Sequence, residues 1–215
     1  MEDLSKPLPL LALETTDVQA SVALYHCGGL LEKTIDSAQR HEETVMPAVA
    51  ALLEEAGAEP KALRALAVDV GPGSFTGVRI GVCHANAMGD ALGIPVVSVN
   101  ALEALAYPHL YKGKAVCALI DARNGNGYGA VYAEDGRELV SPCPCVVEDF
   151  LREILSETIC VGSGYPEGRE HIHAMPQAKD IAALGAEKLR ENPHGEAARP
   201  LYLRQSQAER NRKKA

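Results

Sequence analysis

The chain has 215 residues, of which 47% are hydrophobic, and its formal net charge is −8. This length allows one large domain or two small ones, and the acidic balance argues against a main surface that grips nucleic acid. No apolar run reaches the ~18 residues that a membrane span needs, so we expect no membrane segment. The six cysteines form no Cys-x-x-Cys pair, and acidic residues precede the apolar stretch at 8–13. We therefore expect reduced thiols, no secretory signal and a cytoplasmic protein.

The first half of the chain switches between two hydrophobic periods. Short apolar runs bounded by glycines or polar residues predict strands, and Gly28-Gly29 predicts a hairpin between the second and third of these. Apolar residues at helical spacing over 45–56 predict a helix, and Asn100 is the predicted N-cap of a short one. The predicted strands are 8–14, 19–25, 30–36, 66–70 and 94–99. The predicted helices lie around 42–56, from 75 to about 92, and just after Asn100.

The second half repeats this order of three strands, a helix and a further strand. Its predicted strands are 115–121, 128–133, 137–141 and 158–161, and its predicted helices are 147–155 and 180–190. Strands mixed with helices favour α/β sheets covered by helices. We therefore predict two related α/β subdomains with mixed sheets, at 1–103 and 104–203. Whether the last helix of the second subdomain packs on its own subdomain or back on the first subdomain is left open by the sequence.

Residues 204–215 form a basic tail that contrasts with the acidic remainder of the chain. They hold Arg204, Arg210, Arg212, Lys213 and Lys214 against Glu209. A solvated, frayed tail is one interpretation. A tail that reaches toward RNA or an acidic partner is the other.

Residues 66–81, LAVDVGPGSFTGVRIG, place a glycine loop between a predicted strand and a predicted helix. Such a loop usually holds a phosphate, but a P-loop needs a lysine where Val78 follows Gly77. When the dinucleotide fingerprint Gly-x-Gly-x-x-Gly is counted from Gly71, its third glycine falls on Thr76, so this motif is also absent. Backbone amides at the helix start, with Arg79 nearby, leave an anion site as a secondary interpretation.

Small residues recur every four positions in the predicted helix: Gly77, Gly81, Ala85, Gly89 and Gly93. A glycine inside a helix costs about 1 kcal/mol relative to alanine, so the row must be compensated elsewhere. Small residues at this spacing make a shallow groove into which another helix can pack. That helix belongs either to the same chain or to another subunit, and the apolar Val78, Val82 and Met88 beside the row favour another subunit.

The stretch GPGSFTGVRIG closely resembles the signature of the bacterial TsaB (YeaZ) family. Four further stretches agree in order and spacing, so the resemblance spans nearly the whole chain: LALETTDVQASVAL, RHEETVMP, IDARNGNGYGAVY and RPLYLR. The resemblance implies an actin-like fold, related to Hsp70 and sugar kinases, made of two α/β subdomains. It also implies a role in forming threonylcarbamoyladenosine at position 37 of tRNAs that read codons starting with A.

The family implies a non-catalytic partner of the transferase subunit TsaD. The implied partners are a TsaD-like subunit in a heterodimer, a TsaE-like ATPase, tRNA through the complex, and a second copy when the protein is alone. No intrinsic cofactor is implied, although the complex binds ATP or ADP. The family's subunit interface is carried over to Ser74, Phe75, Thr76, Gly77, Val78, Gly81, Val82, Ala85, Met88 and Gly89. A vestigial nucleotide or anion site is assigned to Glu14, Thr15, Thr16, Gly71, Gly73 and Arg79.

The chain departs from related enzymes at the positions that carry chemistry. TsaD-type catalysis resembles metal chemistry with two histidines one helical turn apart, but position 45, one turn after His41, is Val. Many family members have Asp-Thr where this chain has Glu14-Thr15, and we expect the extra methylene to move the carboxylate outward. Asn126 replaces a common Glu, while Asp121 and Arg123 are expected to brace the hairpin.

We therefore predict no catalytic residue and no metal ligand. Two alternative functions remain open: an active actin-like ATPase or kinase, and a peptidase that acts on its partner. The second would need Ser74 as nucleophile, which lacks a Gly-x-Ser-x-Gly context. The pairs Cys143 with Cys145 and His171 with His173 lack the usual zinc spacing, and nothing in the sequence joins them.

Overall fold

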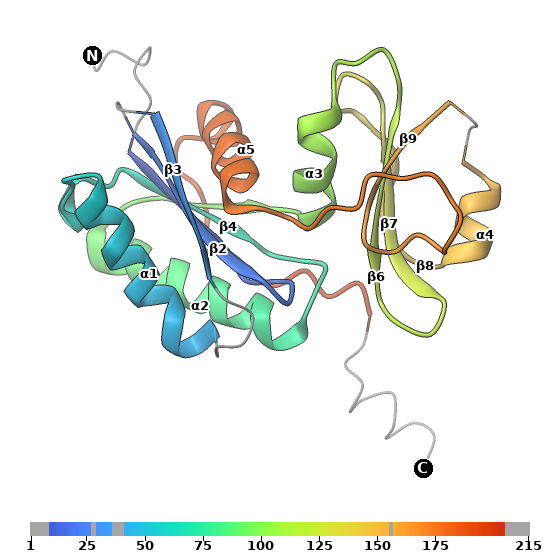
Figure 1. The fold of residues 1–215 in the computed structure, drawn as a ribbon. Helices are drawn as coiled ribbons and strands as arrows, with labels where there is room; N and C mark the ends of the chain where they lie inside the picture. Colours follow the sequence, from blue (N-terminus) through green and yellow to red (C-terminus); the bar gives the residue numbers. More distant parts are fainter. Residues whose placement is uncertain (1–8, 27–28, 36–40, 155–156, 205–215) are drawn as a thin grey trace. The chain divides into compact units, whose positions relative to one another are not determined.

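The computed structural model describes residues 9–26, 29–35, 41–154 and 157–204. The chain divides into two compact units, coloured along the sequence in Figure 1. The first unit comprises the residues up to Ala104 together with Pro176–Pro200, and the second comprises Leu105–Met175 with the segment from Leu201 onward. Within the described residues, no helix is both long enough and apolar enough to cross a membrane. Of the predicted tail 204–215, only Arg204 lies among them.

The first unit is built on a five-stranded mixed sheet in the order β3-β2-β1-β4-β5. Strands β1, β2 and β3 pair antiparallel, whereas β1 with β4 and β4 with β5 pair in parallel. All residues of β1 and β4 are buried, as expected for apolar strands at the centre of a sheet covered on both faces. The strands are β1 (Leu10–Glu14), β2 (Ala20–His26), β3 (Gly29–Ile35), β4 (Ala65–Asp69) and β5 (Val96–Val99).

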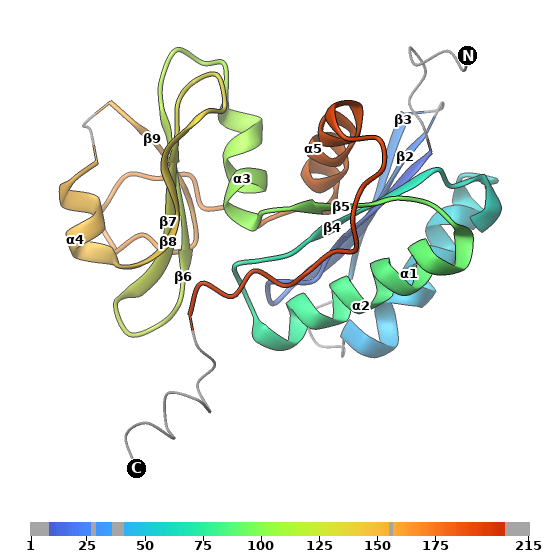
Figure 2. The same cartoon turned by 180° about the vertical axis from the view of Figure 1, so that it is seen from behind.

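Helices cover both faces of this sheet, with α1 (His41–Glu55) and α2 (Phe75–Leu92) on one face and α5 (Ala178–Glu191) on the other (Figures 1 and 2). Gly81 of α2 lies against Val68, while Gly185 of α5 lies against Ala67. Neighbouring residues of a strand point to opposite faces, so these two contacts fix the sides. The short elements are η1 (Pro60–Ala62), α3 (Ala101–Ala106) and η2 (Tyr107–His109).

The second unit repeats the topology of the first with a four-stranded sheet in the order β8-β7-β6-β9. Strands β6, β7 and β8 pair antiparallel, and β6 pairs with β9 in parallel. The strands are β6 (Val116–Asp121), β7 (Asn126–Tyr132), β8 (Glu138–Val146) and β9 (Ile159–Gly162), with α4 (Val147–Arg152) before β9. The prediction of an α/β fold with two related subdomains and mixed sheets is therefore confirmed.

The largest difference from the predicted elements is the length of β8. The sequence predicts a strand at 137–141, but β8 continues through Pro144 to Val146. Proline cannot donate a hydrogen bond to a neighbouring strand and is tolerated at a sheet edge, and β8 is an edge strand. Helix α4 is shorter than the predicted 147–155, because Arg152 is its last residue.

Candidate functional site at the glycine loop

The site lies where two adjacent parallel strands end. Strand β1 ends at Glu14 and β4 ends at Asp69, so both acidic residues lie at the same edge of the sheet. Thr15 and Thr16 follow the first strand, and the glycine loop leads from the second into α2. Carboxyl ends of parallel strands are the usual place for ligands in α/β sheets, which makes this edge the first candidate.

Both acidic side chains are fully buried at this edge. The Glu14 and Asp69 residues are each 0% exposed. The backbone N–H of Thr16 donates to Glu14 Oε1 at 2.6 Å, and the Thr16 hydroxyl lies 2.9 Å from the same oxygen. The expectation that the Glu14 carboxylate points outward is therefore wrong. The side chain has room to fold back onto the turn, where Thr16 supplies its hydrogen bonds.

A single hydroxyl lies between the two carboxyl groups. Thr16 Oγ1 is 2.9 Å from Glu14 Oε1 and 3.0 Å from Asp69 Oδ2. A hydroxyl has one proton to donate, so it donates to one carboxyl and accepts from the other. One of the two acids must therefore carry a proton.

Burial assigns that proton to Glu14. Desolvation, followed by the nearby Asp69 charge, raises the pKa of Glu14 well above its ordinary value. Desolvation also raises the pKa of Asp69 to about 7, against hydrogen bonds from the Gly71 N–H and the Thr16 hydroxyl. We infer that Glu14 stays protonated and donates to Thr16, and that Thr16 donates to Asp69 once that carboxyl ionises, at about pH 7. Glu14 Oε2 has no hydrogen-bond partner among the described residues.

Three amides at the glycine loop and the start of α2 are bound to acceptors of the chain itself. The Gly71 N–H donates to Asp69 Oδ1 at 2.7 Å, and the Ser74 N–H donates to the Thr16 carbonyl at 2.6 Å. Ser74 caps α2 by accepting from the Gly77 N–H at 3.3 Å. Amides at a helix start are the donors that a phosphate would need, and these three are already engaged. They close the turn after β1 onto the start of α2.

The other two residues assigned to an anion site, Gly73 and Arg79, differ in their placement. A Cβ at Gly73 would lie 2.5 Å from the Thr16 carbonyl oxygen, so Gly73 allows close packing of two turns. Arg79 is exposed, and its guanidinium lies 3.9 Å from the centroid of the Phe75 ring. The structure brings Glu14, Thr15, Thr16, Gly71 and Gly73 together but directs Arg79 to the outer surface.

The row of small residues in α2 faces the chain's own sheet. A Cβ at Gly77 would overlap the Thr15 carbonyl oxygen, and one at Gly81 would lie 2.5 Å from Thr15 Oγ1. At Gly89 it would lie 2.5 Å from Val96 Cγ2. The prediction that this row receives another helix, from this chain or another subunit, is therefore wrong. Thr15, which follows β1, and residues of β4 and β5 fill the groove. This close contact compensates the helical cost of the glycines.

This packing divides the predicted interface residues into two groups. The buried ones cannot contact a partner while the unit is folded: Gly77, Val78, Gly81, Val82, Ala85 and Gly89. Ser74, Phe75 and Thr76 are exposed, and Met88 is half-buried. On the opposite side of α2, an exposed stripe recurs every four residues at Phe75, Arg79, Cys83 and Ala87. We call this stripe the outer α2 face.

The turn between β6 and β7 is braced as the sequence predicts. Asp121 Oδ1 accepts a hydrogen bond from the Arg123 N–H at 2.8 Å. The Asn126 amide donates to the Arg123 carbonyl at 3.3 Å, and its oxygen accepts from Arg204 Nη2 at 3.0 Å. The residue that replaces the family's common Glu therefore holds the turn and the 201–204 segment together.

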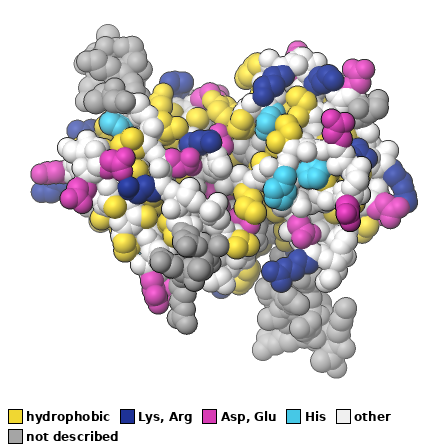
Figure 3. All heavy atoms as spheres, viewed as in Figure 1, with side chains coloured by type: hydrophobic (Ala, Val, Ile, Leu, Met, Phe, Trp, Pro, Cys, Tyr) yellow, Lys and Arg dark blue, Asp and Glu magenta, His cyan; other side chains and the backbone are white. Residues whose placement is uncertain are grey.

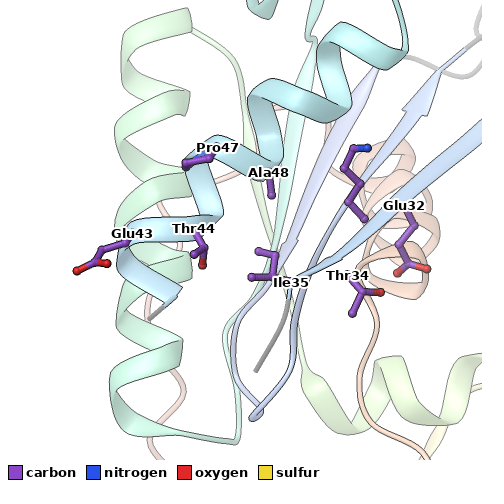
Figure 4. Close-up of a pocket in the computed structure, with 8 residues that line it drawn as sticks. Glu32, Thr34, Ile35, Glu43, Thr44, Pro47 and Ala48 are labelled. Carbon is purple, nitrogen blue, oxygen red and sulfur yellow. The ribbon is translucent and has the colours of Figure 1, made fainter. Parts of the chain in front are cut away.

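A second concave region has no link to the predicted site. A groove of about 750 Å³ lies between β3 and α1 (Figure 4), and its lining is Glu32, Lys33, Thr34, Ile35, Glu43, Thr44, Pro47 and Ala48. The Lys33 amine is already paired with Glu55 at 2.6 Å.

Figure 3 shows acidic and basic side chains interspersed over the visible face of the protein. Across the described residues, no three His, Cys, Asp or Glu side chains gather as a metal site.

Sequence reasoning missed Asp69. The notable signal was an acidic residue at the end of an otherwise apolar strand, directly before the glycine loop. A buried acid at that position needs hydrogen-bond partners, and the neighbouring loop amide and threonine supply them. The predicted site centred on Glu14 is therefore a pair of acids joined by Thr16.

The acid pair predicts a pH dependence of stability. The folded-state pKa of Asp69, about 7, lies above its ordinary value of 3.8, so the folded protein binds the proton more tightly than the unfolded chain. The stability from this group is therefore complete below about pH 4 and declines as the pH rises to 7, by up to about 1.4 kcal/mol per pH unit. We expect Asp69→Asn to flatten this decline in urea unfolding, and Asp90→Asn, on exposed α2 surface, to keep it. Parallel curves for wild type and Asp69→Asn would contradict the assignment.

Comparison with known proteins agrees with the resemblance over more than nine-tenths of the chain. A family model described as "TsaD: tRNA N6-adenosine threonylcarbamoyltransferase" matches residues 30–158. The tRNA threonylcarbamoyladenosine biosynthesis protein TsaB of Escherichia coli K12 is 29% identical over 221 residues, covering 93% of this chain and 96% of that protein. TsaB of Bacillus subtilis 168 is 29% identical over 224 residues, covering 94% and 96%.

Solved structures give the same result. A structure of YeaZ from Pseudomonas aeruginosa superposes with a TM-score of 0.77 at 31% identity, covering 90% of this chain and 99% of that one. A second, described as an uncharacterized protein with similarity to peptidase YEAZ from the same organism, has a TM-score of 0.80 at 30% identity and covers 91% and 99%. The actin-like fold class is confirmed by these matches and by the repeated sheet topology. The chain belongs to the TsaB (YeaZ) family.

Proposed function

We propose that the protein is a non-catalytic partner of a TsaD-like transferase in the formation of threonylcarbamoyladenosine. The modification falls at position 37 of tRNAs that read codons starting with A, and the complex works in the cytoplasm. The observation that carries this proposal is similarity to TsaB proteins of tRNA threonylcarbamoyladenosine biosynthesis over more than nine-tenths of the chain. The TsaD-type family match over 30–158 supports the relation to the transferase subunit.

The geometry of the candidate site supports a role without catalysis. The two acids at the strand ends are fully buried and bonded to Thr16 and the glycine loop. A general acid or base must reach the proton that it transfers, and both carboxyls are enclosed by the chain. Ser74 has a structural role as the N-cap of α2, which accounts for its position without a peptidase.

The outer α2 face is the surface that we assign to the TsaD-like subunit. Phe75 is 38% exposed, and Arg79 stacks over its ring. Aromatic and arginine side chains carry much of the binding energy at protein interfaces. The same face would serve the homodimer when the protein is alone. The TsaE-like ATPase binds to this assembled complex, and the complex as a whole binds tRNA.

The ATPase or kinase alternative makes a distinct prediction for the isolated protein. Because the Gly71, Ser74 and Gly77 amides are bonded within the chain, we expect titration calorimetry of the protein alone with ATP and magnesium to show no tight binding. We also expect no ATP turnover. Tight binding with turnover would support the ATPase and contradict our proposal. ATP or ADP bound only in the presence of the partners would agree with a site on the complex.

The proposed function is tested by omission from a reconstituted reaction. The mixture contains the cognate TsaD-like subunit, the TsaE-like ATPase, the substrates and tRNA, and threonylcarbamoyladenosine is measured by mass spectrometry of digested tRNA. We expect the product to fall to background without this protein and to return when it is added. An unchanged yield in its absence would contradict the proposal.

A further inference from the structure

Two cysteines lie opposite each other on neighbouring strands of the second unit. Strands β6 and β9 are parallel, and Cys117 is the register partner of Cys160. Neighbouring strands are about 4.8 Å apart, which lies within the range of about 4.4–6.8 Å between the Cα atoms of a disulfide. Cys160 packs against the core cluster that contains Cys117. The two thiols therefore lie on the same face of the sheet.

The chain after β9 folds back over this pair. Val161 and Ile172 form an isolated bridge, and the Ile172 N–H donates to the Cys160 carbonyl at 2.8 Å. The Tyr165 hydroxyl donates to the Cys117 carbonyl at 2.7 Å. The ring of His171 stacks on that of Tyr165, with centroids 4.9 Å apart. Tyr165 and the loop that carries it thus pack beside the two cysteines.

The surroundings give the two thiols different properties. The neighbouring Cys117 thiol lowers the pKa of Cys160 to about 6, against its desolvation. The hydrogen bond with Cys160 and burial raise the pKa of Cys117. Cys117 is fully buried, whereas Cys160 is partly exposed. Since the thiolate is the reactive form of cysteine, Cys160 is suited to react first and Cys117 to react with its product.

We propose that Cys160 and Cys117 form a peroxide-sensitive redox pair that closes into a disulfide between β9 and β6. In the first step, the Cys160 sulfur attacks hydrogen peroxide. A sulfur–oxygen bond forms, the oxygen–oxygen bond breaks, and hydroxide leaves, so two electrons pass from sulfur to the peroxide. In the second step, the Cys117 sulfur attacks the sulfenic acid of Cys160. The sulfur–sulfur bond replaces the sulfur–oxygen bond, and the oxygen leaves as water with the Cys117 proton.

This proposal does not depend on the role in tRNA modification. The pair lies within the second unit, whereas the acid pair and α2 belong to the first. A failure of either proposal therefore leaves the other standing. Cys83 is an internal control, because it is an exposed cysteine on α2.

Peptide mass spectrometry tests the pair directly. The protein is treated with hydrogen peroxide, blocked with iodoacetamide and digested without reduction. We expect a cross-linked peptide that joins Cys117 to Cys160, while Cys83 remains alkylated. In Cys117→Ser, we expect dimedone to trap a sulfenic acid at Cys160, and in Cys160→Ser we expect Cys117 to remain a free thiol. Absence of the cross-link, with Cys83 oxidised as fast as Cys160, would overturn the proposal.

A second measurement uses the unmodified wild type and so does not depend on the variants folding. The rate of iodoacetamide labelling at Cys160 is followed from pH 5 to pH 9, with Cys83 in the same sample. We expect the Cys160 rate to reach half its plateau near pH 6 and to exceed that of Cys83 by on the order of tenfold there. A Cys160 rate that still rises through pH 8.5, like that of an ordinary thiol, would contradict the assignment.

Discussion

Replacing Gly77 by alanine is expected to destabilise the first unit by at least about 3 kcal/mol. Alanine is normally preferred over glycine inside a helix by about 1 kcal/mol. The clash of the added Cβ must therefore outweigh this preference for the substitution to be destabilising. The added Cβ would overlap the carbonyl oxygen of Thr15, and that atom belongs to the backbone after β1. The Thr15 hydroxyl also donates to the Gly77 carbonyl at 2.7 Å, so displacing α2 breaks this bond as well.

The control is the reverse substitution on the exposed side of the same helix. Ala87→Gly has no close packing to lose and should cost only the intrinsic difference, about 1 kcal/mol. Gly81→Ala should lie between the two, because the nearest atom there is the Thr15 side-chain oxygen at 2.5 Å from the added Cβ. Urea unfolding of the three variants measures these differences. A neutral or stabilising Gly77→Ala would show that α2 does not pack on the turn as described.

Changes on the outer α2 face are expected to weaken binding to the TsaD-like subunit without unfolding the protein. Phe75→Ala removes an exposed ring, and Arg79→Glu reverses the charge stacked on it. For central interface residues of these types, losses of about 2 kcal/mol are typical, equivalent to roughly 30-fold in Kd. Affinity for the purified partner, measured by calorimetry, provides the test.

Arg190→Glu is the matched control for the charge reversal. Arg190 is exposed in the last turn of α5, and α5 covers the opposite face of the sheet from α2 (Figure 2). We expect this variant to bind like wild type. Equal affinities for all three variants and wild type would exclude the outer α2 face as the docking surface. The substitution Gly81→Leu would not be informative here, because it would disrupt the packing of α2 on the sheet.

The order of the elements could be predicted from the sequence because each one has a local signal. Apolar runs bounded by glycines marked the strands, and the change of hydrophobic period marked α1 and α5. The repeated order of strands in the two halves predicted two related subdomains, and the topology of the two sheets bears this out. Asn100 was correctly predicted as a cap, since its side chain accepts from the Leu102 N–H at 2.8 Å.

The sequence could not show which surface each helix face contacts. The spacing of Gly77, Gly81 and Gly89 indicated close approach, and the structure shows such an approach, but to the turn after β1 and to β4 and β5. Periodicity defines a helix face and carries no information about what covers it. Likewise, a longer side chain at position 14 suggested an outward carboxylate, whereas Thr16 and Asp69 hold it inside. The first error concerns contacts between α2 and segments far from it in the sequence. The second concerns how one turn folds.

The most direct test of the central claim is the association of the wild-type protein with its cognate TsaD-like subunit. Each purified protein is run alone in sedimentation-velocity experiments, and then the two are mixed at equal concentration. We predict that the mixture sediments as a heterodimer, at the expense of both separate species. If the two proteins sediment independently at every concentration up to the highest that both tolerate, the assignment of this chain as a TsaD partner is contradicted.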